Sequence, residues 1–446
     1  MLTSMREAED LIYQSYLRAV RNIKETDDSK VKKIELTRQL FQLLHSPDTG
    51  QKFILVTGSK GKGSTSRFIS SLLAHLGLKV GLFTSPHLVH FNERIRINGK
   101  AISDHDFIRL SNKVLKPFNM IEAQLSSDEY QGPIGISLAI ATLYFKENNT
   151  DINVIECGRG GEFDDTNILA NEWAVITPIM AEHVPHLGPT IDHIISHKLG
   201  IIKPSTQSVY ISEQYENVPK VEAKIRAKEV SRVSYYGKNF VAKNISLHSG
   251  GTIFDVETDY DLYPQLNLPL LGGFQAVNIA TAIKVCEDII EKKMSYTTLK
   301  ECFGSIQWPG RCEIIDHHPT VILDGAINEK SARFVQEVLE RIGGKQIVSI
   351  VGVPADKDYK GVINVLSEFS SKIIITKPDI SHLAFPEDAI NYAQSLLSNS
   401  VETNVLKEAV ALAKQEPTVD IILIVGTQTL IANAKRLWNH SLMDIG

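Results

Sequence analysis

The sequence predicts an α/β protein in which a mostly parallel sheet is followed by a smaller, Rossmann-like α/β domain. An apolar run at 53–56 passes through a glycine-rich stretch into a helical pattern at 64–76, and a second apolar run follows at 79–83. This order is that of a βαβ unit, whose two strands lie parallel in one sheet. Beyond residue 310, apolar runs again alternate with helical stretches, which indicates a second α/β sheet.

Length and local periodicity place the remaining elements. Because 446 residues exceed the usual size of a single core, we expect two domains, 1–297 and 298–446. Apolar residues recur at helical spacing in four further stretches, which are 5–24, 30–45, 104–114 and 134–147. More strands are expected at 151–156, at 173–178 and, alternating with glycine turns, throughout 207–262.

Composition narrows the class of protein. The formal charge is −5 at pH 7 and no long lysine or arginine run occurs, which argues against nucleic acid as the main partner. The four cysteines show no C-x-x-C spacing, which predicts reduced thiols in a cytoplasmic protein. Neither a secretory leader nor an apolar stretch of about 18 residues is found, so we expect no export and no membrane span.

The stretch Val56–Ser64, which reads VTGSKGKGS, carries the strongest local signal. It joins a predicted strand to a predicted helix, so that backbone N–H groups and the positive end of the helix dipole point at one place. There Lys62 would reach the terminal phosphates of a nucleotide, and Ser64 or Thr65 a magnesium ion. A glycine-rich turn with a solvated lysine is the alternative, because Val56 and Gly63 depart from the strict P-loop pattern. The predicted phosphate-binding residues are Gly58, Ser59, Lys60, Gly61, Lys62, Gly63 and Ser64.

Polar residues also follow other predicted strands. Ser85 and His87 come directly after the second strand, and Glu156 ends a later one. Ligands of open α/β sheets bind at the carboxyl ends of strands, where a carboxylate is a suitable magnesium ligand. On chemistry alone, His87 and His183 are also explained as structural histidines, and Glu156 as a helix cap or an ion-pair partner.

Longer motifs along the chain resemble one family. They read GLFTSPHLVHFNERIRINGKAIS at 81–103, ECGRGGEFDDTN at 156–167, EHVPHLGPTIDHIISHKLGIIKP at 182–204, LLGGFQAVNIATAI at 270–283, WPGR at 308–311 and DGAIN at 324–328. With the glycine-rich loop, they resemble the folylpolyglutamate synthase and dihydrofolate synthase family, a branch of the Mur-type ATP-dependent amide ligases. The resemblance covers nearly the whole chain and implies that the first domain is a P-loop-type nucleotide-binding domain.

The resemblance implies an enzyme that uses ATP to activate an acid as an acyl phosphate and then joins it to an amino acid, L-glutamate. It implies two Mg²⁺ ions, with K⁺ as a further candidate, and a pteroate or folate-like acid. It also implies that Lys198 is carbamylated and, with His183, places the second metal. The residues implied are Lys62, His183 and Lys198 for catalysis; Ser64, Glu156, His183 and Lys198 for metals; Asn278, Arg311 and Asp324 for ATP; and Ser85, His87 and Asp164 for the substrate.

Several positions depart from the family pattern and leave the substrates open. Ile327 replaces the histidine of D-G-A-H-N, Glu162 the arginine of G-G-R, and Asp165 the alanine of D-A-T-N. In bacterial members an aromatic residue and the D-A pair help hold the pterin, so these changes weaken the folate assignment more than the ligase assignment. The acids at 162 and 165 favour an amine or a cationic substrate. The other departures are Lys60, Ile134–Gly135, Glu182, His197 and Phe274.

Three hypotheses therefore remain. The first is a monomeric, ATP-dependent amide ligase that adds L-glutamate to dihydropteroate or to the γ-carboxylate of a folate. The second is a paralogous ligase that joins a different acid and amine by the same chemistry. The third, suggested by Ile327, is a nucleotide-binding protein without turnover. Release of ADP with candidate acids and amines distinguishes the three.

Overall fold

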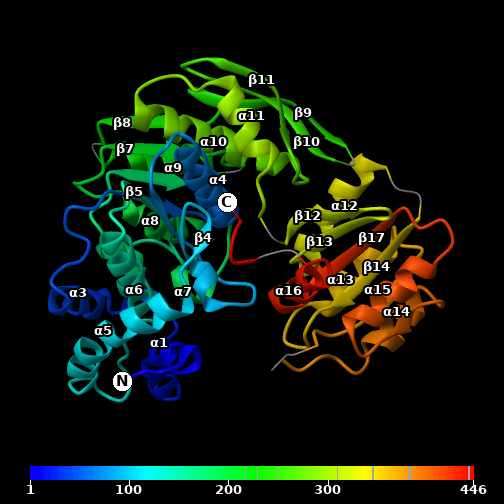
Figure 1. Cartoon of the computed structure of the whole chain (residues 1–446), viewed down its shortest axis with the longest axis horizontal. Coiled ribbons are helices and arrows are strands. Elements are labelled where there is room, and N and C mark those ends of the chain that lie inside the picture. Colours follow the sequence, from blue (N-terminus) through cyan, green and yellow to red (C-terminus); the bar gives the residue numbers. More distant parts are fainter. Residues whose placement is uncertain are drawn as a thin grey trace.

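The protein consists of two lobes, each built around its own β-sheet (Figure 1). The computed structural model describes residues 1–215, 217–228, 230–248, 250–308, 310–343, 346–379, 383–439 and 442–445. Within them, the N-terminal lobe contains an eight-stranded and a three-stranded sheet, and the C-terminal lobe a six-stranded sheet. The predicted α/β class with a mostly parallel sheet and a second α/β domain is confirmed.

The eight-stranded sheet runs in the order β4-β3-β2-β5-β1-β6-β7-β8. The strands from β2 to β8 in this order are parallel, whereas β3 pairs antiparallel with both β2 and β4. Its strands are β1 (Phe53–Thr57), β2 (Val80–Phe83), β3 (Ile95–Ile97), β4 (Lys100–Ala101), β5 (Ile152–Glu156), β6 (Trp173–Ile176), β7 (Ser208–Ile211) and β8 (Arg232–Tyr235). The three-stranded antiparallel sheet comprises β9 (Phe240–His248), β10 (Gly251–Thr258) and β11 (Leu262–Leu268).

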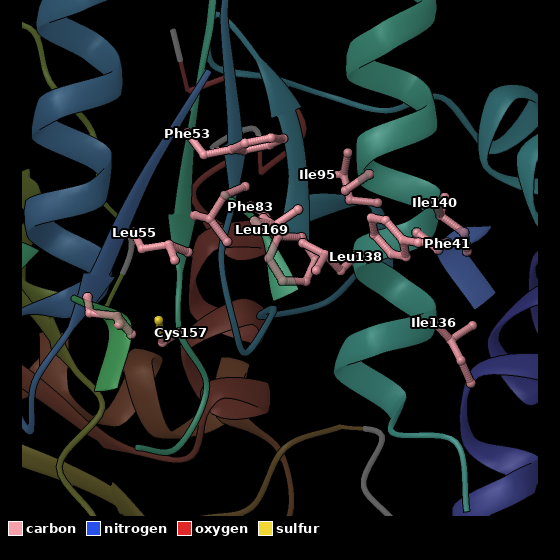
Figure 2. Packing of buried hydrophobic residues seen from close by; sticks show 14 of the residues in the cluster. Phe41, Phe53, Leu55, Phe83, Ile95, Ile136, Leu138, Ile140, Cys157 and Leu169 are labelled. Carbon is pink, nitrogen blue, oxygen red and sulfur yellow. The ribbon is translucent and has the colours of Figure 1, made fainter. Parts of the chain in front are cut away.

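Strand β1 is buried on both faces, which fixes the loop that follows it. Phe53 and Leu55 pack into one hydrophobic cluster together with Leu138 (Figure 2). Ile54 and Val56 point the other way, into a second cluster. This alternation is what a central strand covered by helices on both sides requires.

Helices cover both faces of the large sheet. On the face of Phe53 lie α1 (Met5–Ala19), α3 (Ile34–Leu43), α5 (Asp104–Glu122), α6 (Pro133–Glu147), α8 (Ile191–Lys198) and α9 (Val218–Arg226). On the opposite face lie α4 (Lys62–His75), α10 (Gly273–Ile290) and α11 (Tyr296–Gly304). Short helices α2 (Asp28–Val31) and α7 (Val184–Leu187) complete the lobe. Among the described helices, none combines the length and the apolar content needed to cross a bilayer.

The C-terminal lobe is a sheet of order β12-β13-β17-β14-β15-β16, in which only the β12–β13 pair is antiparallel. Helices α12 (Glu329–Ile342), α13 (Tyr359–Ser367) and α14 (Ala389–Leu396) cover one face, and α15 (Leu406–Gln415) and α16 (Gln428–Leu437) the other. The strands are β12 (Arg311–His317), β13 (Thr320–Asp324), β14 (Ile347–Gly352), β15 (Lys372–Ile375), β16 (Val401–Glu402) and β17 (Ile421–Gly426). Helices on both faces of a mostly parallel sheet match the predicted Rossmann-like type.

Three elements differ from the sequence predictions. Helix α1 ends at Ala19 rather than at residue 24. Helix α5 continues to Glu122 through Pro117, because buried Phe118 and other apolar residues hold its last turns on the core. The prediction of strands alone for 207–262 was wrong at α9, whose narrow apolar stripe is outnumbered by charged residues.

Helix α11 belongs to the first lobe by its packing. Phe303 meets Phe68 of α4 edge-on, with ring centroids 6.2 Å apart, and Leu299 is buried in the same cluster. The division at residue 297 stays a prediction, and this packing favours a crossing between the lobes after residue 306.

The start of helix α6 is satisfied from a distant loop. Its N-cap residue, Gly132, has no side chain to bond the first turn, and the buried Asp165 carboxylate lies there instead. Asp165 Oδ1 accepts a hydrogen bond from Thr37 Oγ1 at 2.7 Å. A methyl group added at Gly132 would lie 2.2 Å from Asp165 Oδ2, and one at Gly135 3.2 Å from Asp165 Cγ. The Asp165 carboxylate is therefore engaged by protein groups inside the fold. Its geometry does not support the expected role in favouring a cationic substrate.

Replacing Asp165 tests this structural role. Asp165→Ala is expected to lower the free energy of unfolding by about 1–2 kcal/mol, because a helix start and the Thr37 hydroxyl lose their acceptor. Urea denaturation measures the change. The exposed neighbour provides the control, since Glu162→Ala is expected to change stability by less than about 0.5 kcal/mol. Equal effects of the two substitutions would contradict the role assigned to Asp165.

Candidate active site

The glycine-rich loop runs from the end of β1 to the start of α4, as the sequence predicts. Gly58 has φ 143° and Gly61 has φ 82°, and α4 begins at Lys62. A methyl group on Gly58 would lie 2.0 Å from Thr177 Oγ1, so this position requires glycine. The helix dipole and the first N–H groups of α4 therefore face the space beyond the sheet edge.

The first part of the loop is tied to the segment that follows β6. Ser59 N–H donates to Pro178 O at 2.7 Å, and Met180 N–H donates to Ser59 Oγ at 2.9 Å. Lys60 N–H also points to Pro178 O, at 3.4 Å, and its side chain is exposed. Ser59 thus shapes the loop, while its assignment to ATP, like that of Lys60, stays a prediction.

Two lysine ammonium groups converge on this loop. Lys62 Nζ and Lys198 Nζ both donate to Gly58 O, at 3.0 and 2.7 Å. Lys198 also donates to Glu182 Oε1 at 3.2 Å and is only 1% exposed. Burial and the nearby Lys62 charge lower the pKa of Lys198 to about 8, against the opposing effect of Glu182. Two cations that share one carbonyl form a place suited to an anion such as a phosphate group.

Glu156 lies beside Gly63 of the same loop. It ends β5, next to Val56 of β1, and its Oε1 would be 3.3 Å from a methyl group on Gly63. Glu156 Oε2 accepts a hydrogen bond from Ser85 N–H at 2.9 Å. A carboxylate and hydroxyl groups next to a phosphate site are the hard oxygen donors that Mg²⁺ prefers. The sequence placed Ser85 with the substrate, whereas its backbone N–H donates to Glu156, which the sequence predicts as a metal ligand.

Ser64 and Thr65, the two hydroxyl candidates for magnesium, differ in their hydrogen-bond partners. Thr65 Oγ1 donates to Asn278 Oδ1 at 3.3 Å, which leaves Ser64 as the better candidate. Asn278 is buried under the loop, where a methyl group on Gly61 would lie 2.7 Å from its Oδ1. Its predicted place near the adenine is not tested by these contacts.

His87 is held neutral by its surroundings. Arg94 Nε donates to His87 Nδ1 at 2.9 Å, so the ring proton resides on Nε2. Burial, with the positive charge of Arg94, lowers the pKa of His87 to about 4. Glu93 supports the same loop by accepting the N–H groups of Leu88, Val89 and His90 at 3.0, 2.8 and 2.7 Å. His87 can therefore donate a hydrogen bond to a substrate but cannot serve as a cationic group near neutral pH.

Asp164 is buried and holds its own loop. Its Oδ1 accepts from Thr166 Oγ1 at 2.7 Å, its Oδ2 accepts from Arg159 N–H at 3.2 Å, and Lys32 Nζ is 3.8 Å away. The structure thus places Asp164 close to the loop after β5, with its oxygens engaged by protein groups. Its role toward a substrate stays a prediction.

His183 and His197 differ in their surroundings. Much of the His183 side chain is exposed to solvent. The burial of the rest, together with the positive charges of Arg159, Lys198 and Lys62, lowers the pKa of His183. The neutral ring, which is the form that binds a metal, is therefore favoured. His197 is buried, and its Nδ1 accepts from Gly161 N–H at 3.3 Å. Its Nε2 has no hydrogen-bond partner in the described part of the chain.

The C-terminal lobe contributes residues at the ends of β12 and β13. Asp324 Oδ2 accepts from Cys312 N–H at 3.0 Å, and Asp324 lies opposite Arg311 in the β12–β13 register. Arg311 begins β12, but its side chain lies outside the part of the structure that is described. Ile327 lies just before α12, which begins after its N-cap residue Asn328.

Two cavities lie between the lobes. The smaller one is next to the loop and is lined by Gly63, Ser85 and Glu156 from the first lobe, by Trp308 from the crossing and by Gln428 from the second lobe. The larger one, of about 860 Å³, is lined by Met180, Phe274 and Val277 from the first lobe and by Lys330 and Phe334 from the second, among others. The larger cavity has room for a ligand that contacts both lobes.

Several site residues were not found from the sequence. They are Glu93 and Arg94, which position the His87 loop, Glu182 as the partner of Lys198, and Trp308, which covers Gly63. Glu93 and Arg94 belong to the motif FNERI at 91–95 and Trp308 to WPGR at 308–311, and this membership was the available signal. Among the described residues, no three His, Cys, Asp or Glu side chains converge on a point that could hold a metal ion. Metal ions would therefore need hydroxyl and phosphate oxygens as further ligands.

The fold and the site together define an ATP-dependent ligase of the Mur type. Residues 56–286 match the Mur ligase middle domain, and residues 310–428 match the Mur ligase, glutamate ligase domain. The chain is 31% identical over 418 residues to the dihydrofolate synthase/folylpolyglutamate synthase of Bacillus subtilis, which covers 90% of this chain and 93% of that protein.

Solved structures agree with this assignment. Folylpolyglutamate synthase (FPGS) of Mycobacterium tuberculosis, complexed with ADP and AMPPCP, matches with a TM-score of 0.82 and 25% identity over 96% of this chain and 99% of that one. An FPGS–AMPPCP–folate complex matches with a TM-score of 0.77 and 26% identity over 97% and 99% of the two chains. The chain belongs to the folylpolyglutamate synthase and dihydrofolate synthase family and is an ATP-dependent acid–amino acid ligase.

A methyl group at position 63 tests whether the space between Glu156 and Trp308 is used. Gly63→Ala is expected to lower kcat/KM about 100-fold, because its methyl group would lie 3.2 Å from Trp308 Cζ2 and beside Glu156 and would displace bound phosphate. The melting temperature should not fall, since alanine favours the helix that glycine weakens. Gly304→Ala is the matched control, because a methyl group there meets nothing within 4 Å. Full activity of Gly63→Ala would contradict the proposed phosphate position.

Proposed function

We propose that the protein adds L-glutamate to a folate-type acid, either dihydropteroate or the γ-carboxylate of a folate, through an acyl phosphate. The observation that carries this proposal is the convergence of Lys62 and Lys198 on Gly58 O, with Glu156 and Ser85 across the loop. The likeness to FPGS bound to AMPPCP and folate supports the same substrates. The chemistry needs one site that holds a triphosphate and presents an acid to it in line.

The reaction proceeds in two balanced steps. A carboxylate oxygen of the acid attacks the γ-phosphorus of ATP, the bond to the bridging oxygen breaks, and ADP leaves. The amino nitrogen of glutamate then attacks the acyl carbon, the C–O bond breaks, and phosphate leaves with the electron pair while the nitrogen loses its proton. Lys62 and the N-terminus of α4 are positioned to neutralise charge on the transferred group.

Magnesium fits the donor set at this loop. Glu156 and the Ser64 hydroxyl would hold one ion, and His183 with a carbamylated Lys198 would hold a second. When bound, these ions neutralise phosphate charge and make the γ-phosphoryl group more electrophilic. K⁺ is a further candidate that the described contacts do not place.

Two further properties belong to this proposal. We propose that the enzyme is cytoplasmic, because its four cysteines are buried and free, as is usual in a reducing compartment. We also propose that it is a monomer, since residues from both lobes of one chain line the two cavities between the lobes.

Lys198 has the surroundings that carbamylation needs. Carbon dioxide reacts with a neutral amine, and the pKa of about 8 makes this form available near neutral pH. The product would replace one of two adjacent cations by an anion, which would relieve the repulsion with Lys62. It would also supply a carboxylate-like oxygen for a metal ion.

ADP release measured with different substrate pairs tests the proposed function. Release is expected only when dihydropteroate or a folate is present together with L-glutamate. Lys62→Ala should reduce turnover at least about 100-fold, because it removes a charge that favours the transition state. Lys116→Ala, an exposed lysine on α5, is the control and should retain activity. Turnover with other acids and amines alone would identify a paralogous ligase, and ATP binding without turnover for any pair would contradict an enzyme.

Labelling with ¹³C-bicarbonate tests carbamylation. The protein is expected to show a carbamate carbon signal that Lys198→Ala lacks. The signal should grow as the pH rises from about 6 to 8, because the lowered pKa of Lys198 converts ammonium to amine in this range. Glu182→Gln should increase it further by removing the anion that favours the ammonium form.

Lys203 provides a matched control for this measurement. Burial lowers its pKa to about 8 as well, but its Nζ donates to Asn167 O and Leu169 O, away from Lys62. Lys203→Met should therefore keep the carbamate signal. A signal that survives in Lys198→Ala and disappears in Lys203→Met would contradict the assignment.

A further inference from the structure

Among the described residues, the C-terminal lobe contacts the N-terminal lobe at several places, two of which meet at one side chain. One is the crossing of the chain near Gln307. The other is the segment 442–445, which comes after α16 in the sequence and lies against the opposite lobe. In Figure 1 the end marked C lies beside α4 and β4, whereas α16 lies in the C-terminal lobe.

Segment 442–445 pairs with the β3–β4 hairpin as an added strand. Ala101 N–H donates to Met443 O at 2.7 Å, and Ile445 N–H donates to Gly99 O at 3.3 Å. Ile445 is also buried, at 1% exposure. Backbone bonds and a buried apolar side chain therefore fasten the segment to the N-terminal lobe, where it covers an edge of the sheet.

Arg67 holds both connections at once. It lies on α4, one and a half turns after Lys62, and it is buried. Its Nε donates to Gln307 O at 3.4 Å, and its Nη2 donates to Ile445 O. One guanidinium group thus links the helix of the phosphate loop to the crossing and to segment 442–445.

Arg96 holds the same segment from the hairpin. It is buried on β3, and it donates to Met443 O at 3.2 Å and to Leu442 O at 2.6 Å. Arg96 also lines the small cavity that contains Ser85 and Glu156. Burial lowers the pKa of this guanidinium to about 10, so it is still charged at neutral pH. Breaking its bonds to the segment would leave a buried charge with fewer partners, which is costly.

The loop that carries His87 makes a third contact with the second lobe. Leu88, next to His87, packs against the hydrophobic cluster of the C-terminal lobe that contains Leu430 and Ile431 of α16. The β3 strand follows the same loop by a few residues. The elements that hold the segment are thus the ones that carry the phosphate loop and the Ser85–His87 loop.

We propose that Arg67 and Arg96 are positioning residues that use segment 442–445 to set the arrangement of the two lobes in which a nucleotide binds. The segment and the crossing both bond to Arg67, so, together with the packing of Leu88, they restrain how the C-terminal lobe can move. This inference does not depend on which acid or amine the enzyme uses.

The double variant Arg67→Met with Arg96→Met tests the proposal on the full chain. Methionine keeps most of the side-chain volume but cannot hold the carbonyl groups of segment 442–445. The affinity for AMPPCP, measured by calorimetry, is expected to fall about tenfold or more, because the second lobe, still joined by the crossing, loses the restraint of segment 442–445 and spends more time in arrangements that do not bind. The distance distribution between spin labels at Asn119→Cys and Lys407→Cys, on exposed positions of the two lobes, should broaden.

Two further variants make the outcome decisive. Arg109→Met removes an exposed arginine that pairs with Asp106 and Glu147 on the surface, and it should change neither the affinity nor the distance distribution. Ile445→Pro removes one backbone bond of the segment without touching a charge, and it should reproduce the broadening if the double variant does not fold. An affinity within twofold of the parent, together with an unchanged distance distribution in a folded variant, would overturn the proposal.

Discussion

The structure depends on two like charges that share one backbone carbonyl. Lys62 from α4 and Lys198 from α8 both donate to Gly58 O. Adjacent cations repel each other, and burial makes this costly, as the lowered pKa of Lys198 reflects. An anion would relieve this repulsion between the two lysines, whether it is a phosphate group of the nucleotide or a carbamate on Lys198 itself. When no anion is bound, the fold itself must be rigid enough to keep the two lysines together.

Rigidity comes from the central strands and from the way the lobes are joined. Strand β1 is buried on both faces, so the loop after it starts from a fixed point. Strand β5 lies beside it and brings Glu156 to the same edge of the sheet. The second lobe is held beside this edge by contacts that include the crossing near residue 307, segment 442–445 and Leu88. A ligase that must hold a nucleotide and then release its products needs such a movable but guided second lobe.

The sequence was most informative where function is local. The glycine-rich loop, Glu156 at a strand end and the family motifs were all predicted from short stretches. Roles that depend on distant partners left no local signal. Asp165 was interpreted as favouring an amine or a cationic substrate because it replaces the family's alanine, and its contact with Gly132 and Gly135 of the distant α6 could not be read from the sequence. Ser85 was not placed beside Glu156 because β2 and β5 are far apart in the sequence. The binding of segment 442–445 by two arginines was invisible for the same reason.

Transfer of an isotope from acid to phosphate tests the central claim most directly. An acid substrate labelled with ¹⁸O in its reacting carboxyl group would be turned over with ATP and L-glutamate, and the released phosphate analysed by mass. If the loop with Lys62 directs the γ-phosphoryl group to the acid, one ¹⁸O atom leaves the carboxyl group in each phosphate formed, and AMP is not produced. Unlabelled phosphate, or label recovered in AMP, would contradict the account.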